Sequence, residues 1–203
     1  MKTSDKIKCT SFPCADIDKN SYVIPSIEVN GEKIKVLMVT EAPPNEKADY
    51  FYSAGNPFYL QTIAQAFRDA GADVSSMQDI LDLGVYITTA IKCGKTQYAI
   101  SPETMRNCSK LLEQEVALFP NTRVFMLMGD VAIKMMNDIW KRQTGKRVIP
   151  AGSTYKIRGQ AYYEGERRVF PSYTPAGKNF LIEKSKRRMV AEDIKEALKW
   201  LKS

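Results

Sequence analysis

Short apolar runs that alternate with helical patterns most constrain the fold of this 203-residue chain. Runs typical of buried strands cover residues 33–40, 85–89, 122–128 and 168–171. Helical patterns cover 58–70, 79–82, 102–118, 130–141 and 184–201, and residues 154–165 resemble a hairpin or an excursion. This alternation predicts one α/β domain over residues 1–203, a three-layer α/β/α sandwich with a central, mainly parallel four-stranded sheet.

Loops that follow the expected strands are the places where functional residues should lie. In open parallel sheets, ligands bind beyond the carboxyl ends of the strands. The loops that begin at Glu41, Thr89 and Tyr173 meet this condition. The first of them contains Pro43 and Pro44, which break any strand ladder, so the chain must leave the sheet there.

Four cysteines and the lack of any histidine limit the metal chemistry. Cys9 and Cys14 lie near the start of the chain, and Cys93 and Cys108 lie in its middle. Four thiolates can hold either a [4Fe–4S] cluster or a tetrahedral zinc ion. Only the first pair has the close spacing that zinc sites commonly use on both sides. Four unconnected buried thiols remain an alternative.

The charge of +7, from 30 Lys and Arg against 23 Asp and Glu, is concentrated in the second half of the chain. Such a surface suits an anionic partner such as nucleic acid, although solvated lysines that only aid solubility fit the charge equally well. The chain has no apolar run near 18 residues, and its first residues lack the apolar core of a signal peptide. We therefore expect a cytoplasmic monomer without membrane contact.

Several motifs, in order over residues 9–200, resemble the uracil-DNA glycosylase superfamily, and most closely its iron–sulfur-containing family 4. Residues 39–43 (VTEAP) and 55–58 (GNPF) resemble its Gly-Glu-Ala-Pro-Gly and Gly-x-Pro-Phe elements. Residues 86–93 (YITTAIKC) resemble its Tyr-Ile-Thr-Asn-Val-Val-Lys-Cys, and Cys108 falls where its next cysteine would be. Residues 169–176 (VFPSYTPA) resemble its strand that ends in His-Pro-Ala.

The resemblance implies a DNA base-excision repair enzyme that hydrolyses the N-glycosidic bond of a flipped damaged base. Glu41 would position the attacking water and stabilise the sugar cation, in a monofunctional reaction with no lyase step. It also implies that a structural [4Fe–4S] cluster, with zinc as the alternative, is held by four thiolates and ties the N-terminal segment to the helix that starts near residue 102. Those ligands are Cys9, Cys14, Cys93 and Cys108.

The expected base pocket consists of Thr40, Ala42, Phe58 and Thr89. Phe58 would stack on the base, or else it belongs to the core. Thr89 stands where the family has the asparagine that reads uracil, and Thr174 stands where it has the histidine that stabilises the departing base. Thr174 would take the catalytic position of that histidine with a weaker donor, so the base specificity should differ from that of a uracil enzyme.

The loop after the last expected strand would contact single- or double-stranded DNA and fill the gap left by the base. Its candidate residues are Lys178, Asn179, Phe180, Leu181 and Lys184. Phe180 or Leu181 would be the wedge, or both would pack under the last helix.

Two other functions remain open from the residues alone. A non-catalytic, lesion-sensing DNA-binding iron–sulfur protein could use the same fold and the same basic surface. A small iron–sulfur electron carrier ranks lower, because the cysteines lie in a long chain with a full α/β core and a proline-rich pocket loop.

Overall fold

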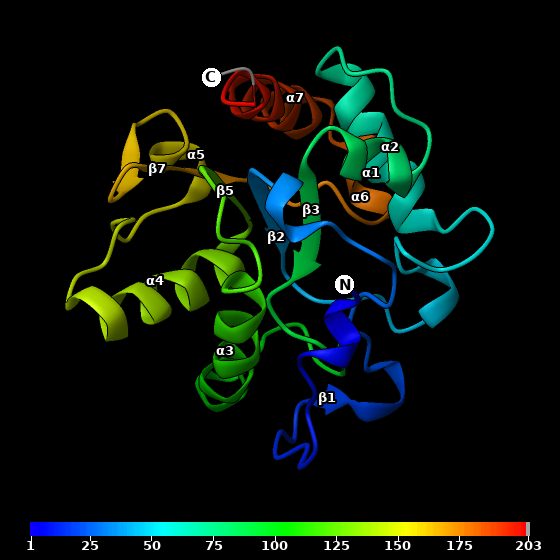
Figure 1. The fold of residues 1–203 in the computed structure, drawn as a ribbon, viewed down its shortest axis with the longest axis vertical. Helices are drawn as coiled ribbons and strands as arrows, with labels where there is room; N and C mark the ends of the chain where they lie inside the picture. The colour runs from blue at the N-terminus through cyan, green and yellow to red at the C-terminus, as the bar shows by residue number, and fades with distance from the viewer. Residues whose placement is uncertain (202–203) are drawn as a thin grey trace.

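A five-stranded sheet in the order β3-β2-β5-β7-β6 forms the centre of the computed structural model, which describes residues 1–201 except the side chains of Lys178 and Asn179 (Figure 1). The first four strands in this order run parallel, and β6 joins the edge antiparallel to β7. The predicted four-stranded parallel sheet is therefore confirmed, with one added edge strand. The strands are β2 Val36–Thr40, β3 Val85–Thr89, β5 Val124–Met128, β6 Tyr162–Glu164 and β7 Arg167–Ser172.

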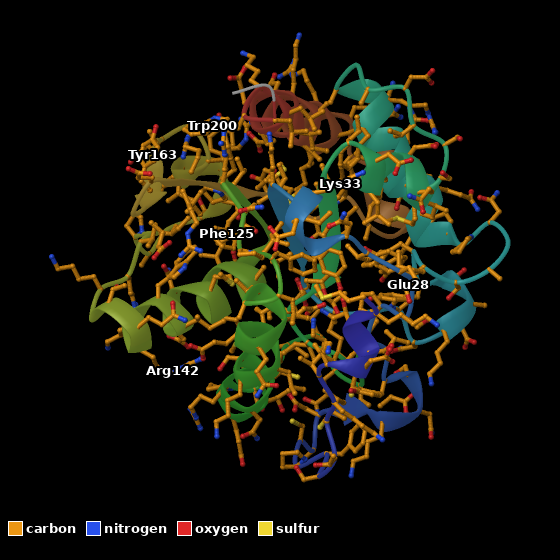
Figure 2. All side chains as sticks on the ribbon, viewed as in Figure 1. Glu28, Lys33, Phe125, Arg142, Tyr163 and Trp200 are labelled. Carbon is orange, nitrogen blue, oxygen red and sulfur yellow. The ribbon has the colours of Figure 1, made fainter. Side chains whose placement is uncertain are left out.

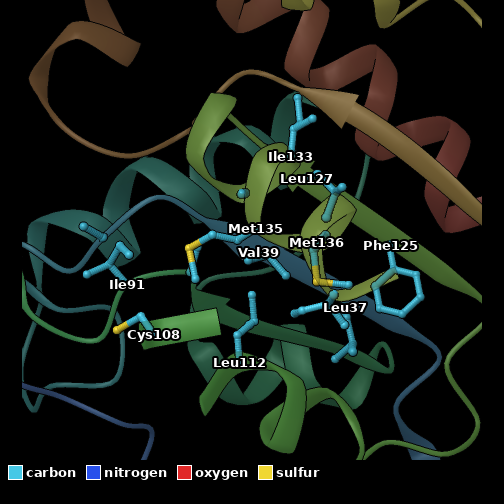
Figure 3. Close-up of a cluster of buried hydrophobic side chains, with 14 of the residues drawn as sticks. Leu37, Val39, Ile91, Cys108, Leu112, Phe125, Leu127, Ile133, Met135 and Met136 are labelled. Carbon is cyan, nitrogen blue, oxygen red and sulfur yellow. The ribbon is translucent and has the colours of Figure 1, made fainter. Parts of the chain in front are cut away.

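Helices cover both faces of the sheet, as the predicted three-layer sandwich requires. Successive side chains of a strand point to opposite faces, so Leu37 and Val39 pack in one core cluster while Val36 and Met38 pack in the other. The first cluster includes side chains of α3 Pro102–Val116 and α4 Asp130–Thr144 (Figure 3). The second includes side chains of α1 Phe58–Asp69, α2 Met77–Asp82 and α7 Lys184–Lys199. Strands buried on both faces explain the continuous apolar runs in the sequence.

The segment expected as a hairpin or an excursion over residues 154–165 contains both a helical turn and a strand. It begins with α5 Thr154–Ile157, and β6 then turns at Gly165 to pair with β7. Arg158 joins this segment to α7, because its Nη2 donates to Asp193 Oδ1 at 2.8 Å. Tyr163 of β6 also lies near Trp200, with ring centres 6.4 Å apart (Figure 2).

The N-terminal segment forms a second, two-stranded sheet that no sequence pattern predicted. Strand β1 Ile17–Asp18 pairs antiparallel with β4 Gly94–Lys95, which directly follows Cys93. Two-residue strands are too short to show a hydrophobic period, which explains why the sequence did not reveal them. Among the helices of residues 1–201, none is both long and apolar enough to cross a bilayer.

A buried ion pair between Lys92 and Glu115 joins β3 to α3, and both side chains are almost wholly inaccessible to solvent. Lys92 Nζ also donates to Thr88 Oγ1 at 2.9 Å and to the Thr89 carbonyl oxygen at 2.5 Å. Glu115 Oε1 accepts hydrogen bonds from Tyr86 at 2.7 Å and from Thr88 at 2.9 Å. With these partners, neither charge is left unmatched, which is the condition for a buried pair to be tolerated.

We expect Glu115→Gln to lower the free energy of unfolding by about 3–5 kcal/mol, because the Lys92 ammonium would remain buried without a counter-charge. The matched control is Glu113→Gln in the same helix, which breaks the exposed pair with Arg142 and should cost less than about 1 kcal/mol. Urea denaturation of both variants measures the free energy of unfolding. Equal losses in the two variants would contradict the prediction that the buried pair contributes more than the exposed one.

Candidate functional site

The parallel topology brings Glu41, Thr89 and Thr174 to the same carboxyl edge of the sheet. Glu41 directly follows β2, Thr89 ends β3, and Thr174 lies just after β7. Thr40 and Thr89 are partners in the last rung of the β2–β3 ladder. Backbone pairing continues beyond the strands, since the Ile91 amide donates to the Glu41 carbonyl oxygen at 2.9 Å. The backbone of Glu41 is thereby held beside the end of β3.

The Glu41 carboxylate lies at the surface of this edge in an ion pair with Lys95. Lys95 Nζ lies 2.5 Å from Glu41 Oε1, and the side chains are 33% and 30% exposed. The same amine donates to the Tyr98 carbonyl oxygen at 3.1 Å. Sequence reasoning missed Lys95, because a lysine in a polar loop shows no pattern and its place depends on the β1–β4 pairing. The carboxylate is both held and accessible, as a group that positions water must be.

The predicted pocket residues Thr40, Ala42 and Thr89 are buried at or just beyond the carboxyl ends of β2 and β3. Thr40 Oγ1 donates to the Thr88 carbonyl oxygen at 3.3 Å. The Thr89 hydroxyl is buried and has no hydrogen-bond partner in the described part of the chain. Leaving a buried hydroxyl without a hydrogen-bond partner lowers the stability of a protein by roughly 1–3 kcal/mol. The Thr89 hydroxyl therefore has hydrogen-bonding capacity at the predicted site that no described residue uses.

Thr174 lies against the end of β5, where its hydroxyl donates to the Met128 carbonyl oxygen at 2.6 Å. Its one hydroxyl proton is therefore engaged, and only acceptor capacity remains. Ser172 holds the preceding strand end, because its Oγ donates to Asp193 Oδ2 at 2.5 Å. Burial raises the pKa of the Asp193 carboxyl, although hydrogen bonds from Arg158 and Ser172 lower it in part.

Phe58 begins α1 and is half-buried, and it belongs to neither core cluster. Its ring is therefore not part of the described core, and the prediction that it stacks on a base stays open. Phe180 is different: it is only 4% exposed and packs in the core cluster that contains α7 side chains. This burial favours, for Phe180, the alternative in which its ring packs in the core under α7.

Leu181 remains the wedge candidate, since its side chain is 44% exposed next to the buried Phe180. Lys184 begins α7, is exposed and makes no ion pair with any described residue. The side chains of Lys178 and Asn179, which we also predicted to contact DNA, lie outside the described residues. The loop thus presents one apolar and one basic group of the predicted five.

The basic surface is smaller than the sequence alone implies, because several cations have acidic partners within the protein. Arg142 pairs with Glu113 at 2.6 Å, and Arg187 pairs with Asp69. The Arg168 guanidinium lies 4.2 Å from the centre of the Phe170 ring. These groups are less available for phosphate contacts than solvated lysines would be.

The four cysteines come from three parts of the chain and line one small cavity. Cys9 and Cys14 lie in the N-terminal segment, Cys93 precedes β4, and Cys108 lies in α3 at the edge of the first core cluster (Figure 3). Phe12 and Tyr22 also line this cavity, with their rings edge to face at 5.0 Å. The predicted convergence of the four thiols is therefore found.

Burial in this cavity favours the neutral form of the Cys93 thiol. Burial raises the pKa of the Cys93 thiol to about 12, and the nearby thiols of Cys108, Cys9 and Cys14 raise it as well. In the described residues, no three Cys, Asp or Glu side chains are grouped closely enough to hold a single metal ion. A four-iron cluster binds each thiolate through a different iron, so its ligands stand further apart than those of one zinc ion. Four thiolates without histidine are a donor set known for both [4Fe–4S] clusters and zinc.

A larger cavity, of about 410 Å³, lies between α3, α4 and residues 147–152. None of the predicted catalytic, base-pocket or cysteine residues lines it. Its walls include both cations and carboxylates, among them Arg106, Lys134 and Asp138. We therefore place the candidate site at the Glu41 edge, where the topology gathers the predicted residues, and not in this cavity.

Gly129→Ala should displace Thr174, because a Cβ at this position would lie 2.9 Å from Thr174 Oγ1. Gly129 also has φ +104° and ψ 167°, a conformation that only glycine adopts readily. The control is Gly145→Ala, at φ +78° with open space around it, which should cost only about 1–2 kcal/mol. Thermal unfolding should show a larger loss for Gly129→Ala, and Thr174→Ala added to it should recover part of that loss.

Comparison with known proteins finds similarity to the uracil DNA glycosylase superfamily. The profile of the uracil DNA glycosylase superfamily matches residues 28–202. A type-5 uracil-DNA glycosylase of Thermus thermophilus is 29% identical over 119 residues, which are 59% of this chain and 52% of that protein. The match thus spans about half the length of this curated relative, which is named type 5 whereas the motifs resemble family 4.

A crystal structure of wild-type UNG from Nitratifractor salsuginis is also similar, with a TM-score of 0.38 and 13% identity over 85% of this chain and 80% of that one. The fold assignment depends instead on the sheet order and layers described above. With most of its length matched by the superfamily profile, the chain belongs to the uracil DNA glycosylase superfamily.

Proposed function

We propose that this protein is a DNA glycosylase that hydrolyses the N-glycosidic bond of a damaged or deaminated base flipped out of DNA. The observation that carries the proposal is the accessible Glu41 carboxylate at the edge where Thr89 and Thr174 also lie. Membership of the superfamily supports the same reaction class. The related Thermus thermophilus protein is itself named a uracil-DNA glycosylase.

Glu41 would act on the sugar side of the scissile bond. Cleavage develops positive charge on the sugar and negative charge on the departing base. A carboxylate beside the sugar stabilises that cation and accepts a proton from the attacking water. The ion pair with Lys95 fixes the position of the Glu41 carboxylate at this edge.

The base side of the site supports an altered specificity. An asparagine offers uracil a paired donor and acceptor, whereas the Thr89 hydroxyl offers one donor and its lone pairs. This hydroxyl has no described partner but is wholly buried, so it would bind one polar atom of a base only after neighbouring side chains move. A single rotatable hydroxyl discriminates poorly among uracil, hypoxanthine and xanthine, so we propose a broader choice of base.

One observation favours the second candidate, a non-catalytic DNA-binding protein that senses lesions. The Thr174 proton is already donated to Met128, and the chain has no histidine. Loss of one donor to the departing base typically costs about 10²–10³ in rate. A protein that lacks such a donor could keep DNA binding while excising bases slowly or not at all.

We further propose a [4Fe–4S] cluster on Cys9, Cys14, Cys93 and Cys108, because these thiols share one cavity. When bound, the cluster would supply a covalent link between the N-terminal segment, the loop before β4 and α3. The rings of Phe12 and Tyr22 line the same cavity and would lie beside the cluster. Its role would be structural, because it would fix β4 and therefore Lys95 beside Glu41.

The function is tested with duplex and single-stranded oligonucleotides that carry uracil, hypoxanthine, xanthine or a mismatched thymine. We expect abasic product from at least one base, and we expect Glu41→Gln to lower its rate by about 10²-fold or more because water is no longer activated. The control is Glu46→Gln in the same loop, where the side chain is exposed, and it should keep the wild-type rate.

The outcomes separate the two candidates. No abasic product on any substrate, together with DNA binding that weakens as salt rises, would support the lesion-sensing protein and contradict catalysis. No DNA binding even at low salt would contradict both.

The cluster proposal predicts a brown protein with four irons when it is purified without oxygen. Cys93→Ser and Cys108→Ser should each lose iron and lower the melting temperature, because the N-terminal segment would no longer be tied to α3. Iron analysis and visible absorption measure the effect. If the protein contained stoichiometric zinc and no iron, the cluster proposal would be wrong and the zinc alternative would hold. Absence of both metals would contradict any metal site.

A further inference from the structure

Lys95 places an amine at the candidate site that hydrolysis does not require. Its Nζ lies 2.5 Å from Glu41 Oε1. Water activation needs only the carboxylate. An amine in contact with that carboxylate is the additional group that covalent chemistry on an aldehyde would use.

Contacts of both the backbone and the side-chain ammonium fix the position of Lys95. Its backbone lies in β4, in register with Ile17 of β1, and the next amide, of Thr96, donates to the Asp16 carbonyl oxygen at 3.2 Å. Its ammonium contacts Glu41, the Tyr98 carbonyl oxygen and the face of the Tyr98 ring, whose centre is 5.7 Å away. About a third of the side chain still reaches solvent. Lys95 is thus held at the site and accessible.

We propose that Lys95 is the nucleophile of a second activity, the cleavage of the DNA strand at an abasic site by β-elimination. The inference rests on the proposed function in one respect, because it takes Glu41 to lie beside the sugar. Base removal leaves a sugar whose open form carries an aldehyde at C1′. That aldehyde would arise next to the Glu41 carboxylate, within reach of the amine that contacts it, so the reaction would profit from proximity. Sequence analysis, which did not consider Lys95, predicted no such lyase step.

The covalent step balances without any oxidant or reductant. Lys95 Nζ passes one proton to solvent and adds its electron pair to C1′. The resulting carbinolamine takes a proton back from solvent on its hydroxyl group and loses water to form an iminium ion. Glu41 takes a proton from C2′, and the electrons of that C–H bond form the C2′–C3′ double bond. The C3′–O bond breaks, and the 3′ phosphate leaves with its electron pair. Water then hydrolyses the imine and restores the free amine.

The experiment uses the full-length protein and an oligonucleotide whose abasic site is made beforehand, so that base excision is not needed. Sodium borohydride reduces an iminium ion to a stable amine and leaves protein covalently bound to DNA. We expect a cross-linked band with the wild-type protein and a yield at least about tenfold lower with Lys95→Arg, which keeps the ion pair but not the nucleophile. Lys47→Arg, an exposed lysine in the loop after β2, is the matched control and should cross-link like the wild type.

Peptide mapping of the cross-linked wild-type protein should place the adduct on residue 95, a readout that does not depend on how a variant folds. No cross-link with the wild type, an equal yield with Lys95→Arg, or an adduct on another amine would overturn the inference. Protein that excises a base but forms no cross-link refutes only the lyase activity. Protein that cross-links to the prepared abasic site but excises no base supports Lys95 and refutes only the proposed glycosylase.

Discussion

The buried ion pair of Lys92 and Glu115 is the interaction on which the site and its surroundings depend. It lies between β3 and α3, and Lys92 also binds the Thr89 carbonyl oxygen at the end of β3. Through Tyr86 it reaches Thr3 in the N-terminal segment, because the Tyr86 hydroxyl, which donates to Glu115, also accepts a hydrogen bond from Thr3 Oγ1 at 3.0 Å. A buried pair is costly to desolvate unless every partner is present. It therefore specifies the mutual position of the sheet, α3 and the N-terminus.

This arrangement connects the thiol cavity to the candidate site. Cys93 follows Lys92 directly, and β4 follows Cys93, so the same short stretch holds a thiol at one point and Lys95 at another. Lys95 then faces Glu41 across the carboxyl edge of the sheet. The buried Lys92, the thiol of Cys93 and the amine of Lys95 thus lie within four consecutive residues. The N-terminal segment contributes to the site through β1, although none of the predicted catalytic residues comes from it.

The expected strands and helices were recovered well where burial on both faces gave continuous apolar runs. Residues 85–89 form the strand as predicted, and Pro102 begins the predicted helix. The site was recovered in part: Glu41 and Thr89 lie at one edge, as strand-end reasoning requires. The sequence left two placements open for Phe180, because an apolar residue in a loop shows the same pattern whether it packs under a helix or points outward, and the structure buries it. Lys95 was not recovered, since its role depends on a two-residue strand pairing.

The sequence by itself determined the α/β class, the thiol count and the superfamily, because apolar periodicity and ordered motifs are local properties of the chain. Only the tertiary structure decided which polar groups are free to react. It showed that the Thr174 proton is engaged by Met128, that the Thr89 hydroxyl has no described partner, and that an amine contacts Glu41. Hydrogen bonds and ion pairs of this kind join residues tens of positions apart, and no pattern along the chain records the distances between them.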